Sequence, residues 1–160
     1  MFSGAASSTA YVNPGPLTFN IRDSTTVTVS RGIDARRLFS EAGYEPDGNQ
    51  SLDLDCYPLA RRTYRRQVLF IEVGTFRQSE DEVRAFLAVR GFCPATIIEV
   101  LLVAKEWDNN RLPYTWVLDQ TLAEEQLGTT AGFCKCSGRH IGRLSRHDGP
   151  YSSILAAVRE

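Results

Sequence analysis

Apolar side chains are most concentrated in residues 79–107, and their spacing there predicts two helices. Two capping boxes of the form Ser/Thr-x-x-Glu mark where these helices begin: Ser79 with Glu82, and Thr96 with Glu99. In a capping box the hydroxyl and the carboxylate accept hydrogen bonds from backbone N–H groups that the first helical turn leaves without partners. Each helix therefore carries its own start signal.

The connection between the two helices is predicted to be short and stiff. Gly91 suits the left-handed residue that ends a helix, and Pro94 keeps the following chain extended. The second helix, Ile97 to Trp107, is apolar nearly all round, and a helix of that kind is buried. We therefore expect Leu101 and Leu102 to be enclosed in the core.

Alternation of apolar and polar residues predicts strands on both sides of the helices. Leu17 to Ile21 and Val27 to Val29 indicate a strand pair or one bent strand with a solvated face. Gln67 to Val73 is apolar on both faces except at Glu72, which indicates a central strand. Shorter strands are predicted at residues 114–118, 133–136, 140–144 and 154–158.

These elements together indicate the fold class. A short amphipathic helix is predicted at Ile33 to Ala42, whereas Tyr44 to Arg66 lacks periodicity and is predicted to be a loop. Strands on either side of the helices indicate an α+β protein with a mainly antiparallel sheet packed around a buried helix pair at residues 79–107. Residues 1–16 are predicted to form an arm or loop, so the single globular domain spans residues 17–160.

Composition narrows the choice of compartment and partner. The 160 residues carry a formal net charge of −1, so a nucleic acid or an acidic membrane would need a local patch. The N-terminal residues lack both parts of a secretory signal, and Glu99 interrupts the best candidate for a membrane span. Four cysteines without such a signal favour a reducing compartment. We expect a soluble cytoplasmic protein with no membrane partner.

A set of motifs between about Leu38 and Leu118 resembles a family of small, uncharacterised bacterial proteins. The matching residues are Ala42-Gly43-Tyr44, Tyr57-Pro58-Leu59, Ser79-Glu80-Asp81-Glu82-Val83 and Arg90-Gly91-Phe92-x-Pro94-Ala95-Thr96-x-x-Glu99-x-Leu101-Leu102. The strand at residues 154–159 is similar to the last strand of that family. The chain departs from the family at Asp119-Gln120, where a Gly-Ser turn is usual, and it has no tryptophan after Trp116.

The same helix-pair motif is more distantly similar to sulfatase-modifying and C-type-lectin-like domains. That similarity comes from a Gly-aromatic-x-Pro-Ala-Thr turn before a buried helix and from a Val-Arg strand at the end of the chain. Both resemblances imply an α+β fold, and the first implies a bacterial protein. Neither implies an activity, because function depends on a site rather than on a fold.

Two arginine-rich stretches are candidate binding surfaces. The first includes Tyr57 and the run of Arg61, Arg62, Tyr64, Arg65 and Arg66; the second includes Arg139, Arg143 and Arg146. Arginine binds phosphate well, and Tyr64 could stack on a base. If the two stretches meet in space, nucleic-acid binding becomes plausible; otherwise a solvated strand edge or loop is the better interpretation.

One group of residues has the side chains that zinc prefers, namely Cys134, Cys136, His140 and His147. Zinc in proteins is bound by four such thiolate and imidazole ligands in a tetrahedron. Structural zinc sites usually separate paired cysteines by two to four residues, whereas here only Lys135 lies between them. The alternative is two ordinary thiols near two surface histidines, and we expect no cofactor.

Three carboxylates form a second candidate metal site. Asp53 and Asp55 would share a side of an extended segment, and with Glu72 they could hold Mg²⁺. Arg65 or Arg66 would then contact a phosphate ester, which is the arrangement of a metal-dependent phosphoesterase or nuclease. The simpler alternative is a set of exposed ion pairs.

The function favoured by these observations is a small binding or interaction module rather than an enzyme. The chain has no Walker A loop, dinucleotide fingerprint, nucleophile elbow or His-Glu-x-x-His motif. Binding often lies in loops on a rigid scaffold, which points to Tyr57 to Arg66 and to Arg139 to His147. A protein or a small ligand is the expected partner. The phosphoesterase and the nucleic-acid-binding protein remain alternatives.

Overall fold

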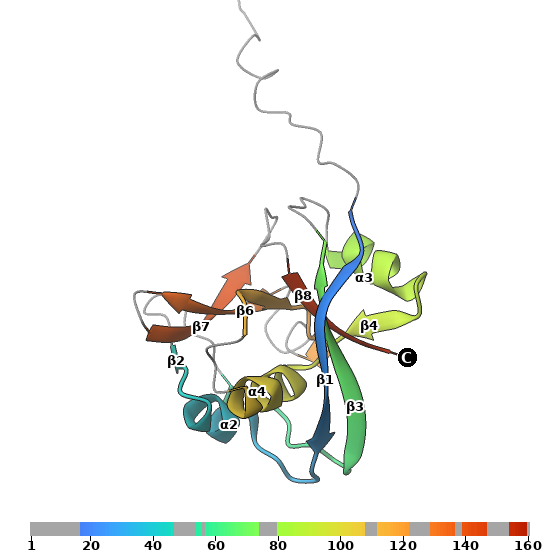
Figure 1. Ribbon diagram of the computed structural model, residues 1–160. Coiled ribbons are helices and arrows are strands. Elements are labelled where there is room, and N and C mark those ends of the chain that lie inside the picture. Colours follow the sequence, from blue (N-terminus) through green and yellow to red (C-terminus); the bar gives the residue numbers. More distant parts are fainter. Residues whose placement is uncertain are drawn as a thin grey trace, which may run out of the picture.

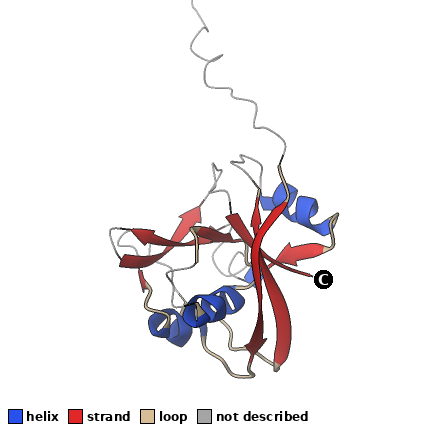
Figure 2. Ribbon diagram, in the orientation of Figure 1, coloured by secondary structure: helices blue, strands red, loops and turns tan. Residues whose placement is uncertain are grey.

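One mixed sheet runs through the molecule in the computed structural model, and helices pack on both of its faces (Figures 1 and 2). The structure describes residues 17–46, 54–55, 57–73, 80–107, 112–121, 129–136, 139–146 and 154–159; the predicted arm at residues 1–16 lies outside them. The strands are β1 Asn20–Val29, β2 Glu45–Pro46, β3 Tyr64–Glu72, β4 Phe92–Pro94, β5 Thr115–Val117, β6 Thr129–Cys136, β7 Arg139–Arg146 and β8 Ile154–Arg159. The helices are α2 Ala35–Glu41, α3 Glu80–Ala88 and α4 Ile97–Glu106.

The strand order is β1-β3-β8-β5-β6-β7-β2, and β4 pairs with β8 beside this path. Neighbouring strands are antiparallel except for the β5–β8 and β2–β7 pairs, which are parallel. This arrangement confirms the prediction of a single α+β domain with a mainly antiparallel sheet. No helix in the described part of the chain is long and apolar enough to cross a bilayer.

Strand β3 is central, as its two-sided apolar pattern predicts. Val68 and Phe70 belong to the hydrophobic cluster on one face of the sheet, and Leu69 and Ile71 belong to the cluster on the other. Successive side chains of a strand point to opposite faces, so one short run supplies both cores. The strand begins at Tyr64, three residues before the predicted start at Gln67.

The early start of β3 follows from its pairing with β1. Tyr64, Arg65 and Arg66 are opposite Val29, Thr28 and Val27 of β1, so the ladder continues beyond the apolar run. Strand β1 is itself one bent strand, because its register with β3 shifts between Ile21 and Asp23. Its buried residues are Val27 and Val29, as the alternation predicts.

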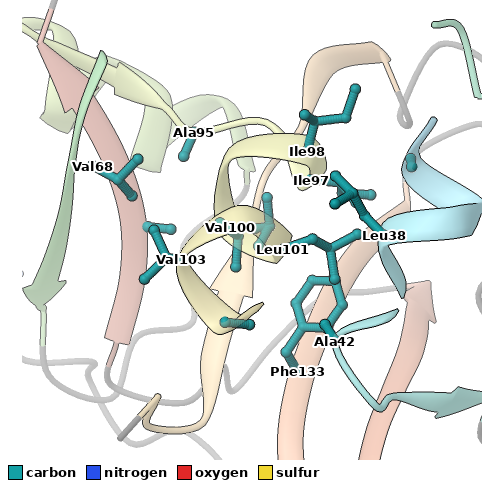
Figure 3. Packing of buried hydrophobic residues seen from close by; sticks show 14 of the residues in the cluster. Leu38, Ala42, Val68, Ala95, Ile97, Ile98, Val100, Leu101, Val103 and Phe133 are labelled. Atoms are coloured by element: carbon teal, nitrogen blue, oxygen red, sulfur yellow. The ribbon is translucent and has the colours of Figure 1, made fainter. Parts of the chain in front are cut away.

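Helix α4 is enclosed between the sheet and α2, as expected. Its capping box is present in full: the Thr96 hydroxyl accepts from the Glu99 backbone N–H at 3.2 Å, and the Glu99 carboxylate accepts from the Thr96 N–H at 2.9 Å. Leu101 is fully buried, and Figure 3 shows it pointing toward Leu38 of α2. Leu102 is only half-buried.

The two helices of residues 79–107 lie on opposite faces of the sheet instead of packing against each other. Val83 and Leu87 of α3 join the cluster of Leu69 and Ile71, whereas α4 joins the cluster of Val68 and Phe70. The helices lie on opposite faces because the segment that connects α3 to α4 forms β4 and pairs with β8. In Figure 2, α3 accordingly lies beside β4, apart from α2 and α4. The predicted cap Ser79 is outside the described residues.

Replacing Gly91 with Ala is expected to lower the free energy of unfolding by about 1–2 kcal/mol. Gly91 has a φ of 81°, in the left-handed region, and an added Cβ would meet no atom within 4 Å, so the cost is conformational. Urea unfolding measures the change. The neighbouring Val89→Ala variant is the control, because Val89 is 84% exposed and its loss should change stability by under about 0.5 kcal/mol. Equal losses of stability in the two variants would contradict the conclusion that Gly91 is needed for its left-handed conformation.

Candidate functional site

Five polar side chains converge at the beginning of α4. We call Tyr57, Tyr64, Arg66, Glu99 and Asp119 the tyrosine–carboxylate cluster. Glu99 is 0% exposed and Asp119 is 3% exposed, and they are the two acidic residues among the buried polar side chains of the described chain. Burying a carboxylate is costly unless hydrogen bonds compensate it, so the partners of these two groups decide what the cluster can do.

Glu99 is held by residues of α4 and β3. Its Oε1 accepts a hydrogen bond from the Tyr64 hydroxyl at 3.0 Å and lies 3.7 Å from Nη1 of Arg66. Its Oε2 accepts from the Thr96 N–H in the capping box. Burial nevertheless raises the pKa of the Glu99 carboxyl above its ordinary value, although these hydrogen bonds and the Arg66 charge act in the opposite direction.

Asp119 accepts three hydrogen bonds directly after β5. Its Oδ2 accepts from the Ile97 N–H at 2.9 Å and from the Tyr57 hydroxyl, and its Oδ1 accepts from the Thr121 N–H at 3.0 Å. Ile97 is the first residue of α4, where backbone N–H groups lack partners within the helix. Asp119 therefore caps α4 from another part of the chain and ties the Tyr57 segment to it.

Both tyrosines hold their protons firmly. Burial raises the pKa of Tyr64 to about 12, with the nearby Glu99 carboxylate adding to the effect. Burial also raises the pKa of Tyr57 far above its ordinary value, and the Asp119 charge raises it further. Each hydroxyl is thus a fixed hydrogen-bond donor to a buried carboxylate. The chemical effect of the cluster is to fasten the Tyr57 segment and β3 onto the beginning of α4.

The cluster also positions two arginines at the surface. The guanidinium carbons of Arg62 and Arg66 lie 5.9 and 5.2 Å from the centre of the Tyr64 ring, within cation–π distance. The Tyr64 hydroxyl donates a hydrogen bond to Glu99, and this bond also holds the ring in place. The Arg62 and Arg66 guanidiniums thus lie over the Tyr64 ring, where a nucleic-acid base would stack in the predicted role.

Unpaired positive charge gathers where β1 ends and β3 begins, at the bottom of the view in Figure 1. We define the basic end as Arg31, Arg61, Arg62 and Arg65, all of which are exposed. Arg31 is held beside the others, because its backbone N–H donates to the Thr63 hydroxyl at 3.0 Å. Within the described ranges, none of the four forms an ion pair.

Several other arginines of the described chain are paired with carboxylates. Arg22 pairs with Glu72, and Arg84 pairs with Glu80. Arg36 and Arg37 pair with Asp55 and Glu41, respectively. Arg90 and Arg159 also form no ion pair within the described ranges, and each guanidinium lies over an aromatic ring. The basic end is therefore distinguished by gathering four such arginines in one place.

The arginine run is divided between two faces of the sheet by the alternation of β3. Tyr64 and Arg66 lie on the same face as Val68, toward α4, whereas Arg65 lies on the opposite face. The prediction of a loop from Tyr44 to Arg66 is wrong for Glu45–Pro46, which forms β2, and for Tyr64 to Arg66, which begin β3. The basic end instead surrounds the end of the β1–β3 pair.

The second arginine stretch lies far from the first in the sheet. Arg139, Arg143 and Arg146 are residues of β7, and β8, β5 and β6 lie between β3 and β7. Neighbouring strands are about 4.8 Å apart, so roughly 19 Å separates the axes of β3 and β7 along the sheet. The two stretches do not meet within the sheet.

Three of the four candidate zinc ligands, Cys134, Cys136 and His140, belong to the paired strands β6 and β7. Cys134 and Cys136 are residues of β6, and the register places Ile141 and Arg139 opposite them, while His140 is opposite Lys135. His147 lies outside the described residues, so zinc binding stays a prediction. Elsewhere, the described part of the chain contains no group of three metal-binding side chains.

Two residues of the candidate Mg²⁺ site, Asp55 and Glu72, are described, and they pair with different arginines. Asp55 pairs with Arg36 of α2 at 3.3 Å, and Glu72 pairs with Arg22 of β1 at 3.0 Å. Both carboxylates are substantially exposed, which matches the simpler interpretation of surface ion pairs. Asp53 is outside the described residues.

Sequence reasoning identified Tyr57, Tyr64 and Arg66 as candidate site residues but missed their carboxylate partners. The sequence predicts that Glu99 completes a capping box and interrupts a membrane span, but it does not predict the pairing with Tyr64, although Glu99 is the one acidic residue within the apolar part of α4. Asp119 was noticed only as a departure from the resembled family. An aspartate directly after a buried strand is a usable signal, since strand ends often position functional side chains.

The comparisons with known proteins return no similarity. No protein-family model matches the chain, and neither a curated protein nor a solved structure is significantly similar to it. The resemblance to small bacterial proteins therefore stays a prediction.

Proposed function

We propose that this chain is a non-enzymatic binding module that holds an anionic partner on its basic end. The observation that carries the proposal is the uncompensated charge of Arg31, Arg61, Arg62 and Arg65. The net charge of the chain is only −1, yet four arginines are gathered at one end of the molecule. Such a local excess of positive charge attracts anions. Arginine suits this role because its guanidinium donates two parallel hydrogen bonds to a phosphate or a carboxylate.

The buried cluster beneath supports the same proposal. Tyr64 is fixed by Glu99, and the Arg62 guanidinium lies over its ring, so this arginine is partly ordered before a ligand arrives. The loop that carries Arg61 and Arg62 is also tied to the end of β1, because Gly32 N–H donates to the Ala60 carbonyl at 2.7 Å. Ordering side chains in advance lowers the entropic cost of binding.

The two alternative functions have less support. A metal-dependent phosphoesterase would need Asp55 and Glu72 to leave their arginine partners and converge with Asp53. A nucleic-acid-binding surface built from both arginine stretches would need β3 and β7 to act together across three intervening strands. Binding of a polyanion at the basic end alone requires neither change.

Replacing Arg61, Arg62 and Arg65 with Ala together is expected to weaken binding of a heparin oligosaccharide by at least about tenfold. Each lost contact should also reduce the slope of log affinity against log salt by about 0.9. Fluorescence anisotropy at several salt concentrations measures both quantities.

The matched control changes the same charge elsewhere. Arg22, Arg37 and Arg84 each have a carboxylate partner, and their triple replacement with Ala also lowers the net charge by three. This control should keep most of the affinity and the salt slope. If the two triple variants lose binding equally, the interaction depends on overall charge and the proposed surface is wrong.

A further inference from the structure

We infer that Glu99 regulates the basic end by neutralising Arg66, so that protonation of this buried carboxylate releases a fifth arginine for the anionic partner. The inference rests on the proposed function, and it adds a mechanism by which pH would change affinity. It follows from the position of Glu99 between the core and the surface. No other buried acid in the described chain pairs with an arginine.

Arg66 is placed where it can serve either partner. Its Nη1 lies 3.7 Å from Oε1 of Glu99, yet its side chain remains 35% exposed. Its guanidinium lies over the Tyr64 ring beside Arg62, a member of the basic end. A charge held at that distance by a carboxylate is compensated, whereas the same charge beside a neutral carboxyl is available to a ligand.

Several elements bring charged or titratable groups close to Glu99. From β3 it faces the Tyr64 hydroxyl and Arg66, and from the segment after β5 it experiences the Asp119 charge. Tyr57 donates to Asp119 and also experiences the Glu99 charge, and burial raises the pKa of both tyrosine hydroxyls, so each keeps its proton. The charged pair of Lys105 and Glu41 is at the other end of α4.

The direction of the effect follows from the Glu99 environment. Burial raises the pKa of Glu99 above 4.5, so protonation begins at a pH nearer neutrality than for an exposed glutamate. The folded protein holds this proton more tightly than the unfolded chain, so stability falls as pH rises from about 4.5 through the folded pKa. Binding an anion near Arg66 should favour the same protonated form, and affinity should rise as pH falls.

The test measures binding of a fluorescent heparin oligosaccharide between pH 4 and pH 8 at constant ionic strength, a range that begins below the ordinary glutamate pKa and over which sulfate groups stay ionised. We expect the wild-type affinity to increase about tenfold toward low pH, as for one added charge-assisted contact. The salt slope should become steeper by about one over the same range. The pH dependence of urea unfolding locates the Glu99 pKa independently.

Two variants separate this mechanism from general acidification. Glu99→Gln keeps one oxygen that can accept from the Thr96 N–H, since glutamine also completes a capping box, and its NH2 group can donate to the Tyr64 hydroxyl oxygen. This uncharged variant should bind at pH 8 as the wild type does at pH 4. Arg66→Gln should bind at every pH as the wild type does at pH 8. Both variants should lose the pH dependence, and thermal unfolding checks that they fold.

The possible failures are distinguishable. If the triple replacement of Arg61, Arg62 and Arg65 leaves binding unchanged, the proposed function is wrong. If that variant loses binding but the wild type binds equally at all pH values, only the role of Glu99 is wrong. Persistence of the wild-type pH dependence in Glu99→Gln would likewise assign the titration to another group.

Discussion

Replacing Leu101 with Ala is expected to lower the free energy of unfolding by about 2–5 kcal/mol. Leu101 is 0% exposed and packs in the cluster that joins α4, α2 and the sheet (Figure 3). Truncation removes apolar surface from this core and leaves a cavity that the helix cannot close, because its turns are fixed on both sides. Urea unfolding followed by circular dichroism measures the change.

Leu102→Ala is the matched control for this prediction. The two leucines are adjacent on α4 and have the same helix propensity, but Leu102 is only half-buried. Its truncation should cost clearly less than that of Leu101, on the order of 1 kcal/mol. Equal losses would mean that helix propensity, and not enclosure of Leu101, determines the result.

The parts of the fold that could be predicted depend on signals close together in the sequence. The Thr96–Glu99 capping box, the apolar surface of α4 and the two-sided apolar run of β3 all lie within a few residues. Each signal predicts its own element correctly, because helix capping and strand alternation depend only on residues close together in the chain. These signals cannot say which face of the sheet a helix covers.

The face chosen by each helix depends on pairing between distant segments. Strand β4 forms only because Phe92 to Pro94 finds β8, which begins at Ile154. That contact places α3 and α4 on opposite faces, while their sequences describe two capped helices and a turn. A three-residue strand carries too few residues for a periodic pattern, and so its presence could not be predicted.

The candidate site shows the same division between local and distant information. Tyr57 and Tyr64 were singled out in the arginine-rich segment, yet their partners are 62 and 35 residues further on. The alternation of β3 then divides Arg65 from Arg66, which a loop interpretation cannot anticipate. Residue types predict a basic surface, whereas the limits of that surface and the contact of Arg66 with Glu99 depend on the fold.

Replacing Asp119 with Ala is expected to lower the free energy of unfolding by about 3–5 kcal/mol. The change leaves three donors without their acceptor: the Ile97 N–H, the Thr121 N–H and the Tyr57 hydroxyl. Each buried donor that loses its partner costs about 1–3 kcal/mol. Asp55→Ala is the control, because this exposed carboxylate pairs with an exposed arginine and should cost under about 1 kcal/mol.

A double-mutant cycle tests whether Asp119 acts through Tyr57. Tyr57→Phe alone should cost about 1.5–3 kcal/mol, the value of a hydrogen bond to a charged acceptor. In the Asp119→Ala background the same change should cost much less, because the hydroxyl it removes has already lost its acceptor. We expect a coupling of at least about 1 kcal/mol, which urea unfolding of the four proteins measures. Additive losses would show that Tyr57 and Asp119 act separately, and the tyrosine–carboxylate cluster would then not join the Tyr57 segment to α4.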